Sequence, residues 1–332
     1  MSAVEGPLRA TPRRRFGGSA RHDDLTPSGT PRGSRRLVAT WVPYALVSPS
    51  MLVLLLIIGF PLIFALVISF QDFNAFQLVS GGPIQWVGFQ NYQRAISTDL
   101  LPVLVRTVLF TVANVGLTMG IGFALALLMR RAGKWPRILL SVSLVVVWAI
   151  PQVTATEIFQ WLFDYAFGVV NWVLTQIHLG GFQYHDWWSN PVSLLGIATL
   201  IVVWGAVPFV ALTLFAGLLQ IPDDLYEAAR VDGAGFWSQL RAITVPLLLP
   251  ILLLLTTLSV LWDSRVFTQI YFLQQQGGIP SDTNLFGLWA YETSFAGQEY
   301  GKGAAISMLS AAILLIVTAV AVRQMVKSAA TA

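Results

Sequence analysis

The 332-residue chain contains no cysteine, so it can form no disulfide bond and offers neither a thiolate metal ligand nor a cysteine nucleophile. Charged residues are also scarce, at 11% of the sequence, whereas ordinary soluble domains carry roughly 25%. Hydrophobic residues make up 55%. This balance is typical of a polytopic membrane protein and favours one membrane domain over two soluble domains.

The motifs of common enzyme classes are absent as well. His22, His178 and His185 lack metal-ligand spacing, and the sequence contains neither H-E-x-x-H nor G-x-S-x-G. The segment closest to a phosphate-binding loop is GQEYGKG at residues 297–303, which is one residue short and has no Ser or Thr after Lys302. We therefore expect no catalytic residue, no metal site and no cofactor in this chain.

Residues 1–40 differ in composition from the rest of the chain. They hold eight arginines and three acidic residues, a net charge of +5, among dense Pro, Gly and Ser. This composition predicts a disordered basic cytoplasmic tail. We favour a solvated tail near anionic lipid over nucleic-acid binding, and expect no nucleic-acid partner.

Six apolar stretches are long enough to cross a bilayer as helices, because a hydrocarbon core of ordinary thickness needs about 20 residues. They are 44–70, 103–129, 138–162, 192–219, 247–273 and 304–322. The sequence therefore predicts an all-α fold, with residues 41–325 forming one six-helix transmembrane domain in contact with membrane lipid.

The basic residues predict the orientation of these helices. With the N-terminus inside the cell, 16 of the 20 Lys and Arg residues lie in cytoplasmic segments. Only Arg94, Arg106 and Lys302 then lie outside, and Arg265 lies within a span. We expect both termini to be cytoplasmic.

Two features of the spans bear on their packing. Pro61 and Pro208 lie inside apolar runs, where they are expected to kink the helices. Small residues recur in the second run, a pattern that favours close approach of another helix. They are Gly116, Gly120, Gly122, Ala124 and Ala126.

The segment 163–191 would lie outside the membrane and has no Lys or Arg. It is rich in aromatic residues, and these include Tyr165, Trp172, Tyr184, Trp187 and Trp188. We favour an aromatic belt at the membrane interface, with direct stacking on a sugar as the alternative.

The loop 220–246, between the fourth and fifth spans, is half polar and would face the cytoplasm. Asp223 and Asp224 suit a helix N-terminus, where carboxylates interact with the helix dipole. Gly233 is suited to end that helix, and a second helix is expected from Phe236. The loop therefore predicts a helix–turn–helix bracket that projects from the membrane.

The spacing within this loop resembles the EAA motif of permease subunits of ABC importers, written EAA, three residues, Gly, nine residues, Ile, one residue, Leu-Pro. Glu227-Ala228-Ala229, Gly233, Ile243 and Pro246 match it, and Val245 replaces the usual Leu. The segments PIQWVGFQNYQRAI and IYFLQQQGGIPSDTNLFGLWAYETSF are similar to segments of carbohydrate permeases related to the maltose and glycerol-phosphate systems.

The resemblance implies a type I permease fold in the bacterial cytoplasmic membrane and a coupling role for the bracket. It assigns ATPase coupling to Glu227, Ala228, Ala229, Asp232 and Gly233. The implied partners are a second homologous permease, an ATPase dimer and an extracytoplasmic solute-binding protein. ATP and Mg²⁺ would then be bound by the ATPase.

Asp263 and Arg265 are charged residues within the fifth span, where burial in lipid is costly. Two residues apart, they point to different sides of a helix and are not expected to pair. Whether each faces the solute or a neighbouring helix stays open. By resemblance, the residues along the solute pathway are Phe209, Ser259, Trp262, Asp263, Val266 and Thr268.

We therefore expect a permease subunit of an ABC importer for a sugar or oligosaccharide, without catalytic activity of its own. One alternative is an ABC permease for a non-sugar solute, such as glycerol phosphate, a peptide or a polyamine. Another is a polytopic membrane enzyme that uses Asp263 or Glu157 as an acid or base.

Overall fold

A computed structural model describes residues 32–178 and 180–331 and shows that these residues are mostly helical. The described residues fall into two units, which divide between Gly59 and Phe60. The first contains helix α1 (Arg32–Leu54) and the π-helix η1 (Leu55–Gly59). Residues 1–31 of the expected basic tail lie outside the described residues, and residues 32–40 begin α1.

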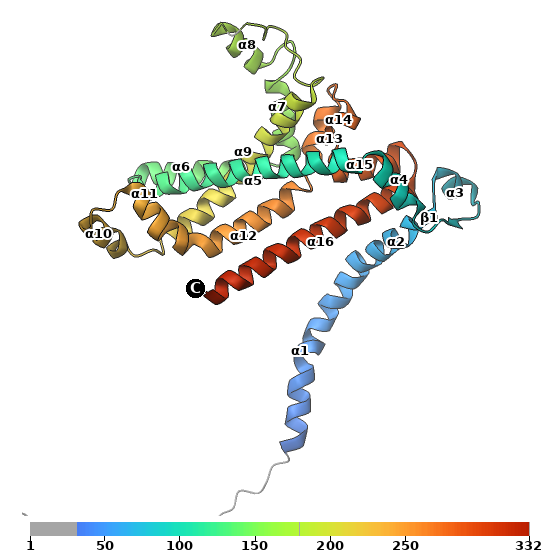
Figure 1. The fold of residues 1–332 in the computed structure, drawn as a ribbon, viewed down its shortest axis with the longest axis horizontal. Coiled ribbons are helices and arrows are strands. Elements are labelled where there is room, and N and C mark those ends of the chain that lie inside the picture. Colours follow the sequence, from blue (N-terminus) through green and yellow to red (C-terminus); the bar gives the residue numbers. More distant parts are fainter. Residues whose placement is uncertain (1–31, 179, 332) are drawn as a thin grey trace, which may run out of the picture. The chain divides into compact units, whose positions relative to one another are not determined.

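The second unit begins with helix α2 and contains the remaining elements (Figure 1). Its first half comprises α2 (Phe60–Ser69), β1 (Gln71–Asp72), α3 (Ala75–Ser80), β2 (Gln85–Trp86), α4 (Gln90–Thr98), α5 (Leu100–Arg131), α6 (Lys134–Trp148), α7 (Gln152–Leu162) and α8 (Val169–Gln176). Its second half comprises α9 (Pro191–Leu218), α10 (Asp223–Val231), α11 (Phe236–Gln239), η2 (Leu240–Thr244), α12 (Val245–Asp263), α13 (Thr268–Gln274), α14 (Pro280–Thr283), α15 (Phe286–Tyr291), η3 (Glu292–Ala296) and α16 (Tyr300–Thr331).

Five helical segments among the described residues are long and apolar enough to cross a membrane. They are Val42–Ser69, Leu100–Arg131, Pro191–Leu218, Phe236–Gln274 and Tyr300–Val320. The stretch predicted as the third span consists of two helices, Lys134–Ala149 and Gln152–Leu162, bent by 98°. The bend follows from Pro151, which has no backbone N–H to donate and disfavours helical geometry in the residue before it. The described residues thus contain five candidate spans, or six if the bent pair counts as one.

The helices α5 and α9 form the centre of the second unit and run alongside each other (Figure 1). Gly122 of α5 lies against Val210 of α9, so closely that an added Cβ would lie 2.7 Å from a Val210 methyl carbon. Gly116 and Gly120 have no described atom within 4 Å of such a Cβ. The predicted close helix approach is therefore confirmed at Gly122 and not at the other two glycines.

The segment between α2 and α4 is fastened to the start of α16. Strands β1 and β2 pair antiparallel, and Asn91 of α4 donates hydrogen bonds to the carbonyls of Ser69 and Gln71. Gly301 of α16 donates its N–H to Phe73 over 2.8 Å. A Cβ at Gly301 would lie 2.2 Å from the Gln71 oxygen, so this approach requires glycine.

Candidate translocation cavity and coupling helix

The loop 220–246 folds into the predicted helix–turn–helix bracket. Helix α10 has Asp223 and Asp224 in its first turn and is followed by Gly233 at φ +82°. The Ala234 N–H donates to the Ala229 carbonyl over 2.8 Å, and the Gly233 N–H donates to Arg230 over 3.0 Å. This hydrogen-bond pair is the Schellman ending, in which a left-handed glycine satisfies the last carbonyls of a helix.

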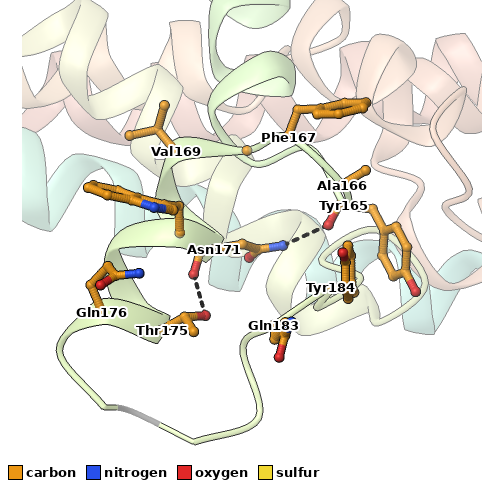
Figure 2. A pocket seen from close by; sticks show the side chains of 11 residues that line it. Tyr165, Ala166, Phe167, Val169, Asn171, Thr175, Gln176, Gln183 and Tyr184 are labelled. Atoms are coloured by element: carbon orange, nitrogen blue, oxygen red, sulfur yellow. Dashed lines mark hydrogen bonds between the residues drawn. The ribbon is translucent and has the colours of Figure 1, made fainter.

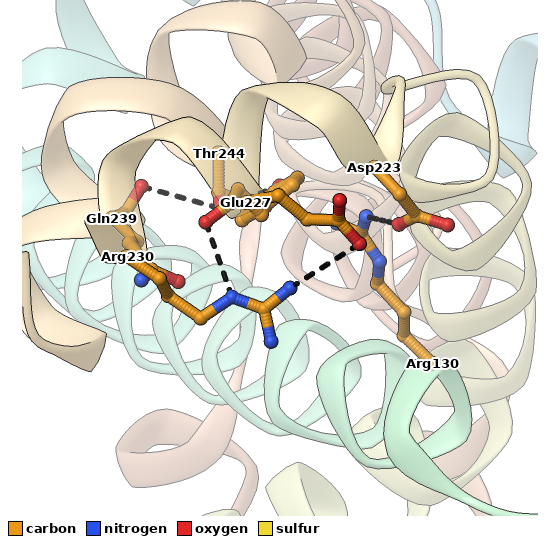
Figure 3. Close-up of polar contacts among 7 residues, drawn as sticks. Arg130, Asp223, Glu227, Arg230, Gln239 and Thr244 are labelled. Carbon is orange, nitrogen blue, oxygen red and sulfur yellow. Dashed lines mark hydrogen bonds and ion pairs between the residues drawn. The ribbon is translucent and has the colours of Figure 1, made fainter. Parts of the chain in front are cut away.

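Side chains from α5 and η2 hold α10 in place (Figure 3). The Arg130 guanidinium donates to Asp223 Oδ1 over 2.9 Å and lies 4.1 Å from the centre of the Tyr226 ring. The Tyr226 hydroxyl is 2.9 Å from Thr244 Oγ1. Because α5 and η2 both contact α10, the bracket is braced from two sides.

The residues assigned to ATPase coupling lie along the outer side of this bracket. The Glu227 side chain is 69% exposed and is 3.9 Å from Arg230. Ala228 and Asp232 are also exposed, and Ala229 is half-buried. Val231 and Trp237 add large apolar side chains that are 88% and 69% exposed. The bracket therefore presents carboxylate and apolar groups together, which another protein could cover.

A cavity of about 330 Å³ lies between the α6–α7 bend, α9 and the end of α12. Five of the six predicted pathway residues line it, namely Phe209, Trp262, Asp263, Val266 and Thr268. The Phe209 and Trp262 rings are 5.6 Å apart with their planes at 59°. Ser259 does not line this cavity, and it is buried one helical turn before Asp263.

Asp263 and Arg265 both line the cavity but do not pair with each other. Asp263 is only 4% exposed, and its Oδ2 has no hydrogen-bond partner among the described residues. The Arg265 side chain is exposed, and its Nε donates to the Leu261 carbonyl over 3.0 Å. The predicted absence of direct pairing is confirmed within the described part of the chain.

The cavity is also lined by residues that were not predicted from the sequence, among them Trp148, Gln152, Gly205 and Gln269. Gln269 Nε2 donates to Gln152 Oε1 over 2.7 Å, which joins α13 to the first turn of α7. The available signal was the pair Pro151-Gln152, because a proline followed by a polar residue interrupts an otherwise apolar run.

Residues 116–329 match the protein family described as the binding-protein-dependent transport system inner membrane component. The diacetylchitobiose uptake system permease protein DasB of Streptomyces coelicolor is 40% identical over 286 residues, covering 86% of this chain and 87% of the relative. The sulfoquinovosyl glycerol transport system permease protein SmoG of Agrobacterium fabrum is 32% identical over 281 residues, covering 84% and 88%. The trehalose/maltose transport system permease protein MalF of Thermococcus litoralis is 34% identical over 236 residues, covering 71% and 78%.

The fold is also similar to that of a solved structure. A chain from a bacterial ABC transporter involved in the import of the acidic polysaccharide alginate superposes with a TM-score of 0.72. The match covers 89% of this chain and 99% of that chain, at 19% sequence identity. The arrangement of helices is therefore that of an importer permease, as the sequence predicts.

Proposed function

The chain belongs to the family of binding-protein-dependent transport system inner membrane components, and we propose that it is the membrane-spanning permease of an ABC importer for a sugar or oligosaccharide. It is a multi-pass protein of the bacterial cytoplasmic membrane and a transport subunit. A membrane enzyme acting through Asp263 or Glu157 is disfavoured by this membership.

The cavity beside Asp263 is the observation that carries the proposal. Phe209 and Trp262 present aromatic faces that suit the C–H face of a pyranose. The free Asp263 oxygen is an acceptor for sugar hydroxyls, and a buried acceptor without a partner is costly unless a ligand or another chain satisfies it. Aromatic faces combined with a hydrogen-bond acceptor fit a polyhydroxylated solute, and the positive charge of Arg265 in the same lining disfavours a polyamine.

The three relatives named above are permeases for diacetylchitobiose, sulfoquinovosyl glycerol and trehalose/maltose. Each of these solutes contains a sugar ring, which supports a glycoside as the solute of this chain. Glycerol phosphate would need a cation, and Arg265 is the cation that lines the cavity. Its guanidinium turns toward the Leu261 carbonyl, so the sugar remains the favoured solute.

Transport requires an energy source, and we place it in a partner ATPase dimer that binds ATP and Mg²⁺. The bracket would dock in a cleft of that ATPase through Glu227, Ala228 and Ala229, with Asp232 and Gly233 forming the turn. A second homologous permease would complete the pathway, and an extracytoplasmic binding protein would deliver the solute. The exposed apolar residues Val231 and Trp237 support a protein contact at the bracket.

The first test is uptake of radiolabelled diacetylchitobiose and maltose by cells that carry the whole importer. We expect Asp263→Ala to reduce uptake while the subunits still co-purify, because the variant removes one acceptor and leaves the helices intact. Glu157→Ala is the matched control, since Glu157 is an exposed carboxylate on α7 outside the cavity. Unchanged uptake in Asp263→Ala would refute the pathway assignment.

The second test is purification in mild detergent, with identification of the co-eluting subunits. Glu227→Arg is expected to lose the ATPase and retain the second permease, because it reverses the charge on the exposed face of α10. Asp99→Arg, an exposed carboxylate at the start of α5, is the control. If wild-type chain elutes alone, the coupling proposal fails.

A further inference from the structure

A second cavity, of about 510 Å³, lies in the segment that joins α7 to α9. Figure 2 shows it between helix α8 and the chain around Gln183 and Tyr184. We propose that this cavity binds a neutral sugar ring of the incoming solute, as a subsite separate from the cavity beside Asp263. The proposal rests on the carbohydrate function proposed above.

Hydrogen bonds to one buried side chain fix the walls of this cavity. Asn171 is only 5% exposed, and its amide nitrogen donates to the carbonyls of Tyr165 and His185 over 3.3 and 3.0 Å. Its oxygen accepts the indole N–H of Trp187 over 2.7 Å. Asn171 thus joins both sides of the segment, and the cavity is formed before any ligand arrives.

The packing of the segment against the helices adds to this rigidity. Trp188 is 5% exposed and belongs to a core cluster that also includes Leu194 and Ile270. The Trp187 ring meets the Phe163 ring edge to face at 5.3 Å. These two tryptophans are structural, so neither the expected interfacial belt nor stacking on a sugar describes them.

The lining of the cavity combines exposed aromatic rings with side-chain amides. Tyr165, Trp172 and Tyr184 are 51%, 63% and 56% exposed, and the two tyrosine rings lie 5.7 Å apart. Gln176 and Gln183 supply amide donors and acceptors at the same opening (Figure 2). Aromatic faces beside uncharged hydrogen-bonding groups match the C–H faces and hydroxyls of a sugar.

The uncharged lining of the cavity favours a neutral ligand. The lining contains no Asp, Glu, Lys, Arg or His among the described residues. The adjacent carboxylate, Asp164, accepts the backbone N–H groups of Ala166 and Phe167, both over 2.8 Å. Because that charge is already satisfied by backbone donors, the site offers nothing that would select an anion or a cation.

The absence of cysteine gives a direct test, since one introduced cysteine is unique in this chain. We would introduce Gln183→Cys in the full importer, without the binding protein. The rate at which a maleimide labels this chain would be measured in the presence and absence of diacetylchitobiose or maltose. We expect saturable protection by sugar. Gln85→Cys, an exposed position on β2 away from the cavity, is the matched control and should label at the same rate throughout.

A second substitution separates a sugar site from other occupants. Adding Trp172→Ala to Gln183→Cys should raise the half-protecting sugar concentration about tenfold, the loss of one aromatic contact. Trp86 is a comparably exposed tryptophan outside the cavity, so Trp86→Ala should leave the half-protecting sugar concentration unchanged. Asp263→Ala should also leave protection unchanged, because it alters the other cavity.

Each remaining outcome overturns the inference. If sugar gives no protection, or equal protection at Gln85→Cys, the cavity binds no sugar. If only the binding protein protects Gln183→Cys, the surface is a protein contact instead. If spin-labelled lipid quenches the fluorescence of Trp172 in the reconstituted importer, this side chain belongs to an aromatic belt at the membrane interface. Uptake measured in parallel distinguishes these results from failure of the proposed function, because that failure would abolish wild-type sugar uptake as well.

Discussion

Arg130 and Asp223 are 93 residues apart in the sequence and form an ion pair of 2.9 Å. The pair joins the last turn of α5 to the first turn of α10. Since α5 packs along α9, and α9 contributes Phe209 to the cavity beside Asp263, this contact connects the bracket mechanically to the proposed solute pathway. We therefore expect a displacement of α10 by the proposed partner ATPase to act on α5 first.

Substitutions of these two residues should have unequal effects. Asp223 is 86% exposed, and exposed ion pairs contribute about 0.2–1 kcal/mol. Arg130 also lies over the Tyr226 ring, a contact of about 0.5–1 kcal/mol at exposed sites. Arg130→Gln should therefore lower uptake and speed amide exchange in α10 more than Asp223→Asn does. Asp224→Asn, which has no ion pair among the described residues, is the control; equal effects of the first two variants would contradict this account.

The turn of the bracket gives a second prediction. Gly233 has φ +82°, and a Cβ there would have no described atom within 4 Å. Gly233→Ala should therefore act only through backbone strain, at about 1 kcal/mol. We expect faster amide exchange at the end of α10 and reduced coupling of ATP hydrolysis to uptake. Gly235→Ala is the control, because Gly235 has φ −73° and similarly open surroundings; an equal effect there would exclude the backbone explanation.

The bracket could be predicted from the sequence because its signals are local. Asp223, Gly233 and Phe236 mark the start of one helix, its end and the start of the next within one short segment. Five of the predicted pathway residues line one cavity, and they were chosen because two segments of the chain resemble motifs of known permeases. Their role in binding solute stays a prediction.

The remainder of the cavity depends on contacts between distant segments. Gln152 meets Gln269 across 117 positions only because the chain bends by 98° before α7. Hydropathy marks 138–162 as one span and carries no information on such a bend. Likewise, Gly116, Gly120 and Gly122 look alike in sequence, and only the position of α9 decides which one is in contact.

That distinction among the glycines can be tested by stability. Gly122→Val should lower the unfolding temperature of the detergent-solubilised chain, because its Cβ would meet Val210 at 2.7 Å and the Ala211 backbone nitrogen at 3.3 Å. Overpacking of this kind costs about 1–3 kcal/mol. Gly120→Val should be tolerated, since the described residues leave its Cβ in open space. A comparable loss in both variants would mean that overpacking against α9 is not the cause.

The segment that forms the second cavity should depend on Asn171. Asn171→Ala would leave the partly buried Trp187 indole N–H and His185 carbonyl without their partner, and about 1–3 kcal/mol per fully buried group is the upper bound of the cost. We expect the segment to open, which limited chymotrypsin digestion can detect because residues 163–191 are rich in aromatics and lack Lys and Arg. Gln176→Ala is the control, since this exposed side chain lines the cavity without bracing it. If Asn171→Ala is cleaved faster than wild type and Gln176→Ala is not, the lost hydrogen bonds are the cause. If wild type and Asn171→Ala resist chymotrypsin equally, the packing of Trp187 and Trp188 holds the segment closed without the hydrogen bonds of Asn171.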